Sequence, residues 1–191
     1  MPGVTGKMFE WWMGWHTQEH QRYKLWHPRA HVANGTREMR SDDPGVSDKD
    51  KYMTTHYVTE YIAGHCDRIK ITFFDPRRFF GDSADLAANG TTAMVCGRVD
   101  LQTAPITVGW LIHQIRESDT GTEMRSRFWL GAPQISGSRR NDPRNWFLRT
   151  RLFQSLALPK NLATEMVVHC GMEMNHLAGF LPDLYALYNP D

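Results

Sequence analysis

The chain has 191 residues, of which 41% are hydrophobic, so it can form one domain with its own core. Its 22 Lys and Arg nearly balance its 21 Asp and Glu, so we expect neither nucleic acid nor an anionic membrane as a partner. Its apolar runs are too short for a membrane span, and no signal peptide is recognised at its start. Its cysteines (Cys66, Cys96 and Cys170) lie far apart, which argues against a disulfide framework and favours a reducing, cytoplasmic compartment.

The first quarter of the chain predicts short helical turns and loops. Residues 16–26 can form one or two helical turns, and Pro28 then disfavours helix and predicts an irregular or extended approach to His31. The Asn-Gly dipeptide at 34–35 is a turn signal, and the charged segment 36–53, which contains "SDDPG", predicts a surface loop.

The middle of the chain predicts an antiparallel sheet, because β-branched and aromatic residues alternate between turn signals. In the first of these strands, a period of two places His56, Val58 and Glu60 on one face. The predicted strands cover residues 52–64, 68–76, 91–101, 106–118 and 123–132.

The same period predicts the faces of the later strands. In "ITVGWLIHQIRE" it places Thr107, Gly109, Leu111 and His113 together. The polar segment 133–150 predicts a loop.

The C-terminal part of the chain predicts a long helix. Helix formers fill residues 158–181, and Gly179 and Pro182 are stop signals. Strands followed by one long helix are typical of an α+β fold in which the helix lies across the sheet.

The segment "HCGMEMNH" on that helix carries the clearest chemical pattern. His169 and Glu173 are four residues apart, so their side chains project from one face, where they can hold a divalent cation. An isolated HxxxE pair is more often a polar patch or a surface pair. Neighbouring apolar residues nevertheless predict that this face is buried: Val167, Val168, Met172 and Leu177.

Two further segments offer ligands. "YVTEY" supplies Glu60, and "HPRAH" supplies His27 and His31. Two His and two Glu suit zinc or another divalent first-row metal. The remaining histidines near turns are expected to be solvated or structural: His16, His20 and His65.

Four segments together resemble the 2,4-diacetylphloroglucinol hydrolase and phloretin hydrolase family: "MFEWWMGWHTQEHQRYKLWHPRAHVANG", "YVTEY", "GWLIHQIRE" and "VVHCGMEMNHLAGFLP". The resemblance runs from about residue 8 to residue 182. It implies a single metal-dependent hydrolase-like domain over residues 1–191 with a helix-grip (Bet v 1-like) fold, in which a curved antiparallel sheet surrounds a long C-terminal helix. It also implies Zn²⁺ as the cofactor and a small aromatic ketone as the substrate.

The resemblance assigns roles to individual residues. Tyr23 and Asn34 match positions that contact ring hydroxyls, and their spacing favours His31 over His27 as a ligand. His113 matches a pocket histidine and is expected to act as the catalytic acid. The implied metal ligands are His31, Glu60, His169 and Glu173, with Glu60 also counted as catalytic.

Two departures from the family pattern affect the expected substrate. Relatives carry an additional N-terminal region, which is expected to be missing or replaced here. Phe128 stands where the family has a substrate-binding Tyr. Because a site that lacks this hydroxyl binds one fewer phenol oxygen, Phe128 favours a less hydroxylated or different carbonyl compound.

The implied reaction is a retro-Claisen hydrolysis, in which metal-activated water attacks an acyl carbon and the phenolic ring carbon leaves. Because fold does not determine function, a metal-dependent isomerase or cyclase and a carrier of apolar aromatic ligands remain alternatives. A third alternative is a structural metal that closes the helix onto the sheet. A homodimer is also compatible with the sequence.

Overall fold

The computed structural model describes residues 1–81, 84–157 and 159–190. Its centre is a six-stranded antiparallel sheet in which each strand pairs with the next along the chain. The strands are β1 (His31–Thr36), β2 (Thr55–Ile62), β3 (His65–Phe74), β4 (Thr91–Leu101), β5 (Ile106–Ser118) and β6 (Gly121–Ile135). The five predicted strands are confirmed, and the fold is α+β as predicted.

Helices lie before, between and after the strands. The N-terminal helices are α1 (Gly6–Trp15) and α2 (His20–Trp26), and α3 (Asp48–Tyr52) lies within the predicted loop at 36–53. Short helices α4 (Arg77–Phe80) and α5 (Ala84–Ala88) connect β3 to β4. After β6 come η1 (Pro143–Asn145), η2 (Phe147–Arg149), α6 (Arg151–Ala157), α7 (Leu162–Ala178) and α8 (Leu181–Tyr188).

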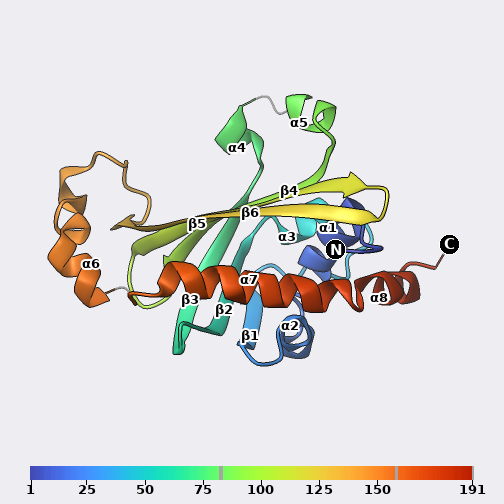
Figure 1. Ribbon diagram of the computed structural model, residues 1–191, viewed down its shortest axis with the longest axis horizontal. Helices are drawn as coiled ribbons and strands as arrows, with labels where there is room; N and C mark the ends of the chain where they lie inside the picture. Colours follow the sequence, from blue (N-terminus) through green and yellow to red (C-terminus); the bar gives the residue numbers. More distant parts are fainter. Residues whose placement is uncertain (82–83, 158, 191) are drawn as a thin grey trace.

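The long helix α7 corresponds to the predicted C-terminal helix and runs across the sheet (Figure 1). It ends before Gly179, as its stop signal predicts. Pro182, however, lies in the first turn of α8, where a missing backbone N–H costs nothing. No helix of the described residues is long and apolar enough to cross a bilayer.

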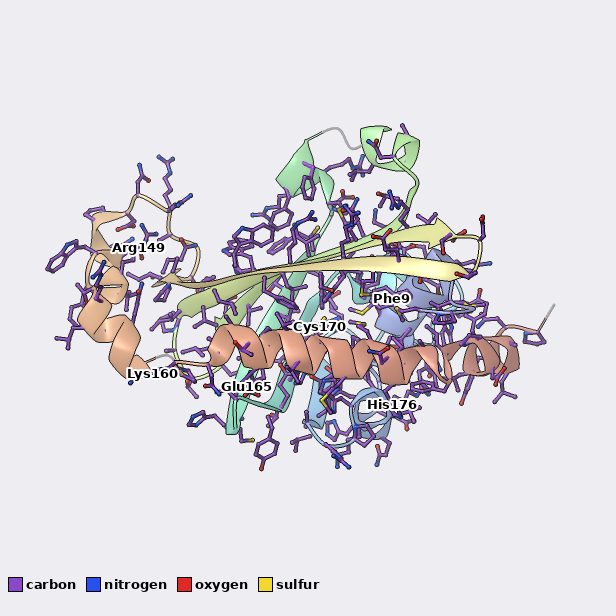
Figure 2. All side chains as sticks on the ribbon, in the orientation of Figure 1. Phe9, Arg149, Lys160, Glu165, Cys170 and His176 are labelled. Atoms are coloured by element: carbon purple, nitrogen blue, oxygen red, sulfur yellow. The ribbon has the colours of Figure 1, made fainter. Side chains whose placement is uncertain are left out.

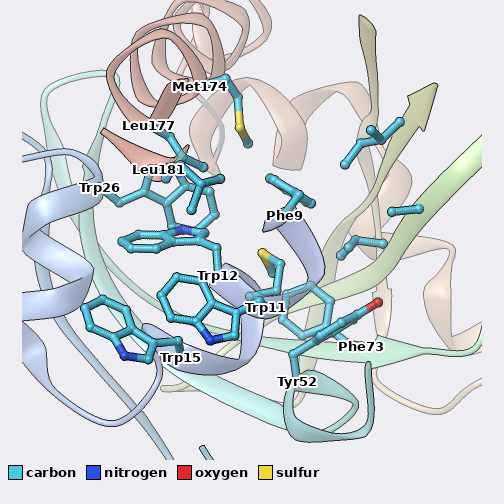
Figure 3. Packing of buried hydrophobic residues seen from close by; sticks show 14 of the residues in the cluster. Phe9, Trp11, Trp12, Trp15, Trp26, Tyr52, Phe73, Met174, Leu177 and Leu181 are labelled. Atoms are coloured by element: carbon cyan, nitrogen blue, oxygen red, sulfur yellow. The ribbon is translucent and has the colours of Figure 1, made fainter. Parts of the chain in front are cut away.

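The main core lies between the inner face of the sheet and the helices. Figure 3 shows Met174, Leu177 and Leu181 from the C-terminal helices approaching Phe9 and Trp12 of α1. The α1 tryptophans also contact α8: Trp11 meets Tyr185 with ring centroids 5.3 Å apart, and Trp15 meets Tyr188 at 5.1 Å. These contacts join the two ends of the chain.

The turn predicted at Asn34–Gly35 is wrong, because both residues lie within the edge strand β1. Asn34 pairs with Val58 of β2, and its backbone N–H donates to His20 Nδ1 at 3.2 Å. Pairing with β2 and anchoring by α2 outweigh the local preference of the dipeptide for a turn.

The predicted face of Thr107 is also wrong. Leu111 and His113 do line the inner face, but the register shifts between Thr107 and Gly109. A β-bulge there reverses the alternation. Thr107 consequently hydrogen-bonds Asp100, on the face opposite to the core residues Val99 and Leu101.

The HxxxE face is buried as predicted, but most of the apolar neighbours on which the prediction relied are not. His169, Glu173 and Leu177 are buried, whereas Val167, Val168 and Met172 are 66%, 50% and 47% exposed. The helix therefore turns its two polar residues toward the sheet and three of its apolar residues outward.

Candidate metal centre

Strand pairing and helix spacing bring the four predicted ligands together. His31 of β1 is the register partner of Glu60 of β2, so the two residues lie side by side at the edge of the sheet. His169 and Glu173, one turn apart on α7, face them across the interior. We call these four buried side chains the His–Glu group.

Distances within the His–Glu group are short. His31 Nε2 lies 3.4 Å from Glu173 Oε2 and 3.5 Å from Glu60 Oε2, and His169 Nε2 lies 3.7 Å from Glu173 Oε2. Candidate ligand atoms of His31, His169 and Glu173 all lie within 4.8 Å of one another. These three residues could therefore hold one metal ion, with Glu60 adjacent.

The orientation of His31 is fixed by Tyr23. Its Nδ1 lies 3.0 Å from the Tyr23 carbonyl oxygen, which can only accept a hydrogen bond, and its ring stacks on the Tyr23 ring with centroids 3.8 Å apart. Burial lowers the pKa of His31, so the ring is neutral and Nε2 carries a lone pair. This Nε2 is buried and has no hydrogen-bond partner, so it fits a metal ligand.

Burial disfavours the charged forms of the two carboxylates of the group. Burial raises the pKa of Glu173 to about 7, although His169 opposes the shift, and burial likewise raises the pKa of Glu60. Tyr23 Oη donates to Glu60 Oε2 at 2.5 Å, which leaves Glu60 held in place. A bound divalent cation would compensate both buried carboxylates.

The His–Glu group forms part of the wall of a cavity of about 640 Å³ between α7 and the sheet. That volume suits a small organic ligand. Figure 2 shows side chains of this helix and of the strands in the region between them. The apolar lining residues include Val58, Ile69, Ile71, Leu111, Phe128 and Met166.

Three of the predicted pocket residues line this cavity: Tyr23, His113 and Phe128. His113 Nδ1 lies 2.8 Å from Ser126 Oγ, and burial lowers the pKa of His113 to about 4. Asn34 is buried but does not line the cavity among the described residues. Its Nδ2 lies 3.5 Å from the His16 carbonyl oxygen, so its contact with a substrate stays a prediction.

Sequence reasoning gave no pocket role to three histidines that line the cavity: His16, His56 and His65. His16 is buried, which fits the structural alternative, and His65 is exposed, as expected of a solvated residue. His56 also lines the cavity, and its position on the face of Glu60 was the available signal. His176 lies outside the His–Glu group, with Nδ1 3.0 Å from the Trp26 carbonyl oxygen.

The family model of the DAPG hydrolase PhiG domain matches residues 1–186. A 2,4-diacetylphloroglucinol hydrolase from Pseudomonas protegens is 33% identical over 96% of this chain and 61% of its own length. A phloretin hydrolase from Eubacterium ramulus is 28% identical over 97% of this chain and 65% of its own length. The chain thus spans less than two thirds of these relatives.

Proposed function

The chain belongs to the DAPG hydrolase PhiG domain family, and on that premise we propose that it is a zinc-dependent hydrolase acting on acylphenols. The reaction breaks the carbon–carbon bond between a phenolic ring and its acyl group. One observation carries the proposal: His31 Nε2, buried and without a hydrogen-bond partner, faces two carboxylates in the wall of a cavity of about 640 Å³. The names of the two relatives support the substrate class.

We assign Zn²⁺ to His31, His169 and Glu173, with Glu60 as the fourth ligand. When bound there, zinc would supply a water of lowered pKa and polarise a carbonyl oxygen. Tyr23 keeps Glu60 and His31 in position through its hydroxyl and its carbonyl. The long helix α7, which lies across the sheet, also supports assigning the helix-grip variant of the α+β fold, and residues of both line the cavity.

His113 would move the proton that prepares the ring for cleavage. In the neutral tautomer whose Nδ1 donates to Ser126 Oγ, His113 can accept the proton of a phenol hydroxyl at Nε2. Returning this proton to the ring carbon that bears the acyl group gives a β-dicarbonyl-like tautomer. Addition of water to the acyl carbon then breaks the bond to the ring, and the products are a carboxylic acid and the deacylated phenol.

The remaining cavity residues would place the ring. Tyr23 lines the cavity beside the His–Glu group, and Phe128 packs near His113 with ring centroids 5.8 Å apart. Asn34 lies outside the described cavity lining, and its contact with a ring hydroxyl stays a proposal that its buried Oδ1, without a hydrogen-bond partner, supports. A homodimer and a cytoplasmic location also stay predictions.

The test joins metal analysis to a screen of acylphenols and β-diketones. We expect one equivalent of zinc per chain and release of one carboxylic acid per phenol formed, both lost with a chelator and restored by zinc. Metal-dependent turnover without acid would instead identify an isomerase or cyclase. Ligand binding by a protein that takes up no metal would identify a carrier, and unfolding on chelation would make the metal structural.

A further inference from the structure

Two histidines that the proposed reaction does not use line the same cavity as the His–Glu group. His16 caps the end of α1, and His56 points inward from β2, four residues before Glu60. Both are 2% exposed, and their ring centroids lie 5.9 Å apart. Four strand residues span about 13 Å, so the backbone of His56 lies that far from the backbone of Glu60 along β2.

Each of these rings uses one nitrogen on a backbone carbonyl. His16 Nδ1 lies 2.8 Å from the Trp12 oxygen, and His56 Nε2 lies 3.2 Å from the Tyr52 oxygen. Since a carbonyl oxygen only accepts, both of these nitrogens carry the proton. The other nitrogens, His16 Nε2 and His56 Nδ1, receive no hydrogen bond from any residue in the described ranges.

The two rings are neutral. Burial lowers the pKa of His56 to about 3 and that of His16 well below its ordinary value. A neutral ring with one nitrogen protonated offers a lone pair at the other nitrogen. The two histidines therefore present two uncharged acceptors, and the ligand that completes them must bring a hydrogen-bond donor.

The surroundings of the two acceptors suit a flat ring. The His16 ring stacks on Tyr23 at 5.9 Å between centroids, and the His56 ring meets Phe73 edge-on at 4.6 Å. Phe128, on the opposite strand β6, offers no hydrogen bond to a phenol. A hydroxyl on an aromatic ring fits these walls, because it is an uncharged donor on a flat apolar body, and it can share its single proton between the two acceptors in a three-centre hydrogen bond.

We propose that His16 and His56 form an acceptor pair that binds a ring hydroxyl of the substrate and makes the protein select free phenols over their ethers. The inference rests on the proposed function and narrows its substrate class. Acylphenols with a free hydroxyl remote from the acyl group bind well, and the same compounds with that hydroxyl methylated bind poorly. This recognition compensates for the hydroxyl that Phe128 does not provide.

The test compares a trihydroxyacetophenone with its O-methyl ethers in calorimetric titrations of both metal-free and zinc-loaded protein. We expect the free phenol to bind about tenfold more tightly than the ether methylated at the hydroxyl that meets the pair, the size of one hydrogen bond. In His56→Phe and His16→Phe this preference falls to about twofold or less. Tyr57→Phe, on the outer face of β2, keeps it.

A second measurement needs no variant and therefore does not depend on whether one folds. In ¹⁵N-histidine spectra of the wild-type protein, the unprotonated nitrogens of two rings should shift when the phenol is added and stay in place with the ether. Unchanged spectra, or a phenol preference that survives in a folded variant, would overturn the inference. Because titrations of metal-free protein involve neither zinc nor turnover, failure of the proposed hydrolysis would show separately, as missing acid release.

Discussion

Two buried polar clusters on opposite faces of the sheet differ in whether their hydrogen bonds are complete. On the outer face, fully buried Asp100 accepts from Thr107 Oγ1 at 2.5 Å, from Ser136 Oγ at 2.9 Å and from Arg98 Nε at 3.0 Å. Its carboxylate is both neutralised and hydrogen-bonded by the protein itself. We call these four residues the Asp100 cluster.

The His–Glu group on the inner face has the opposite balance. It holds two carboxylates, and the described ranges show no Lys or Arg ion pair with Glu60 or Glu173. It also holds the buried Nε2 of His31, which has no hydrogen-bond partner. Because buried polar groups are normally satisfied, the Asp100 cluster is complete by itself, whereas the His–Glu group is incomplete and could be completed by a cation.

The largest expected effect comes from breaking the His–Glu group. Glu173→Gln keeps the shape of the side chain but removes a charged ligand, so bound zinc should fall below one equivalent. Turnover should fall by more than about 100-fold, beyond the loss typical of a supporting partner. Metal analysis and acid release measure both.

The matched control is Glu165→Gln, the same change on the same helix but at a residue whose carboxylate accepts from Asn161. It should keep full metal content and turnover. A Glu173→Gln protein with stoichiometric zinc and normal turnover would show that the ligand assignment is wrong.

Breaking the Asp100 cluster should affect stability instead. Asp100→Ala leaves Arg98, whose side chain is 22% exposed, and two hydroxyls without their acceptor. The free energy of unfolding, measured with urea, should fall by about 3 kcal/mol. Zinc content should stay at one equivalent.

Glu123→Ala is the comparison for this stability loss, since it removes a carboxylate from the exposed ion pair with Arg116. It should leave the free energy of unfolding unchanged. If Asp100→Ala unfolds at the wild-type urea concentration, the cluster contributes nothing to stability.

The contrast between the clusters also shows what the sequence can predict. Alternation predicted the shared face of His56 and Glu60, and helical spacing predicted the shared face of His169 and Glu173, because both depend on local geometry. The segment "HPRAH" has no such periodic signal and offered both His27 and His31, and only the family resemblance favoured His31. His31 pairs with Glu60 because residues 31–36 form an edge strand, which the sequence did not predict, since Asn34–Gly35 is a turn signal.

The predictions that were wrong concern features that depend on tertiary contacts. No local pattern marks the bulge that turns Thr107 toward Asp100. Nor does periodicity say which elements cover a surface, so no pocket position was expected for His16, and Val168 was expected to lie beside a buried face. Such errors concern which face meets which neighbour, while the elements themselves were largely correct.

The smallest expected effect is the stabilisation that zinc itself provides, and it separates the two clusters most directly. A ligand that binds only the folded state adds about 2.7 kcal/mol to the free energy of unfolding at a free concentration one hundred times its dissociation constant. Wild-type protein and Asp100→Ala should gain the same increment in urea titrations with and without zinc, although their starting stabilities differ. Glu173→Gln should gain much less at the same zinc concentration, because its affinity is lower. Equal gains in all three proteins would mean that zinc binds elsewhere, and a smaller gain in Asp100→Ala than in the wild type would mean that the two clusters are coupled through the sheet.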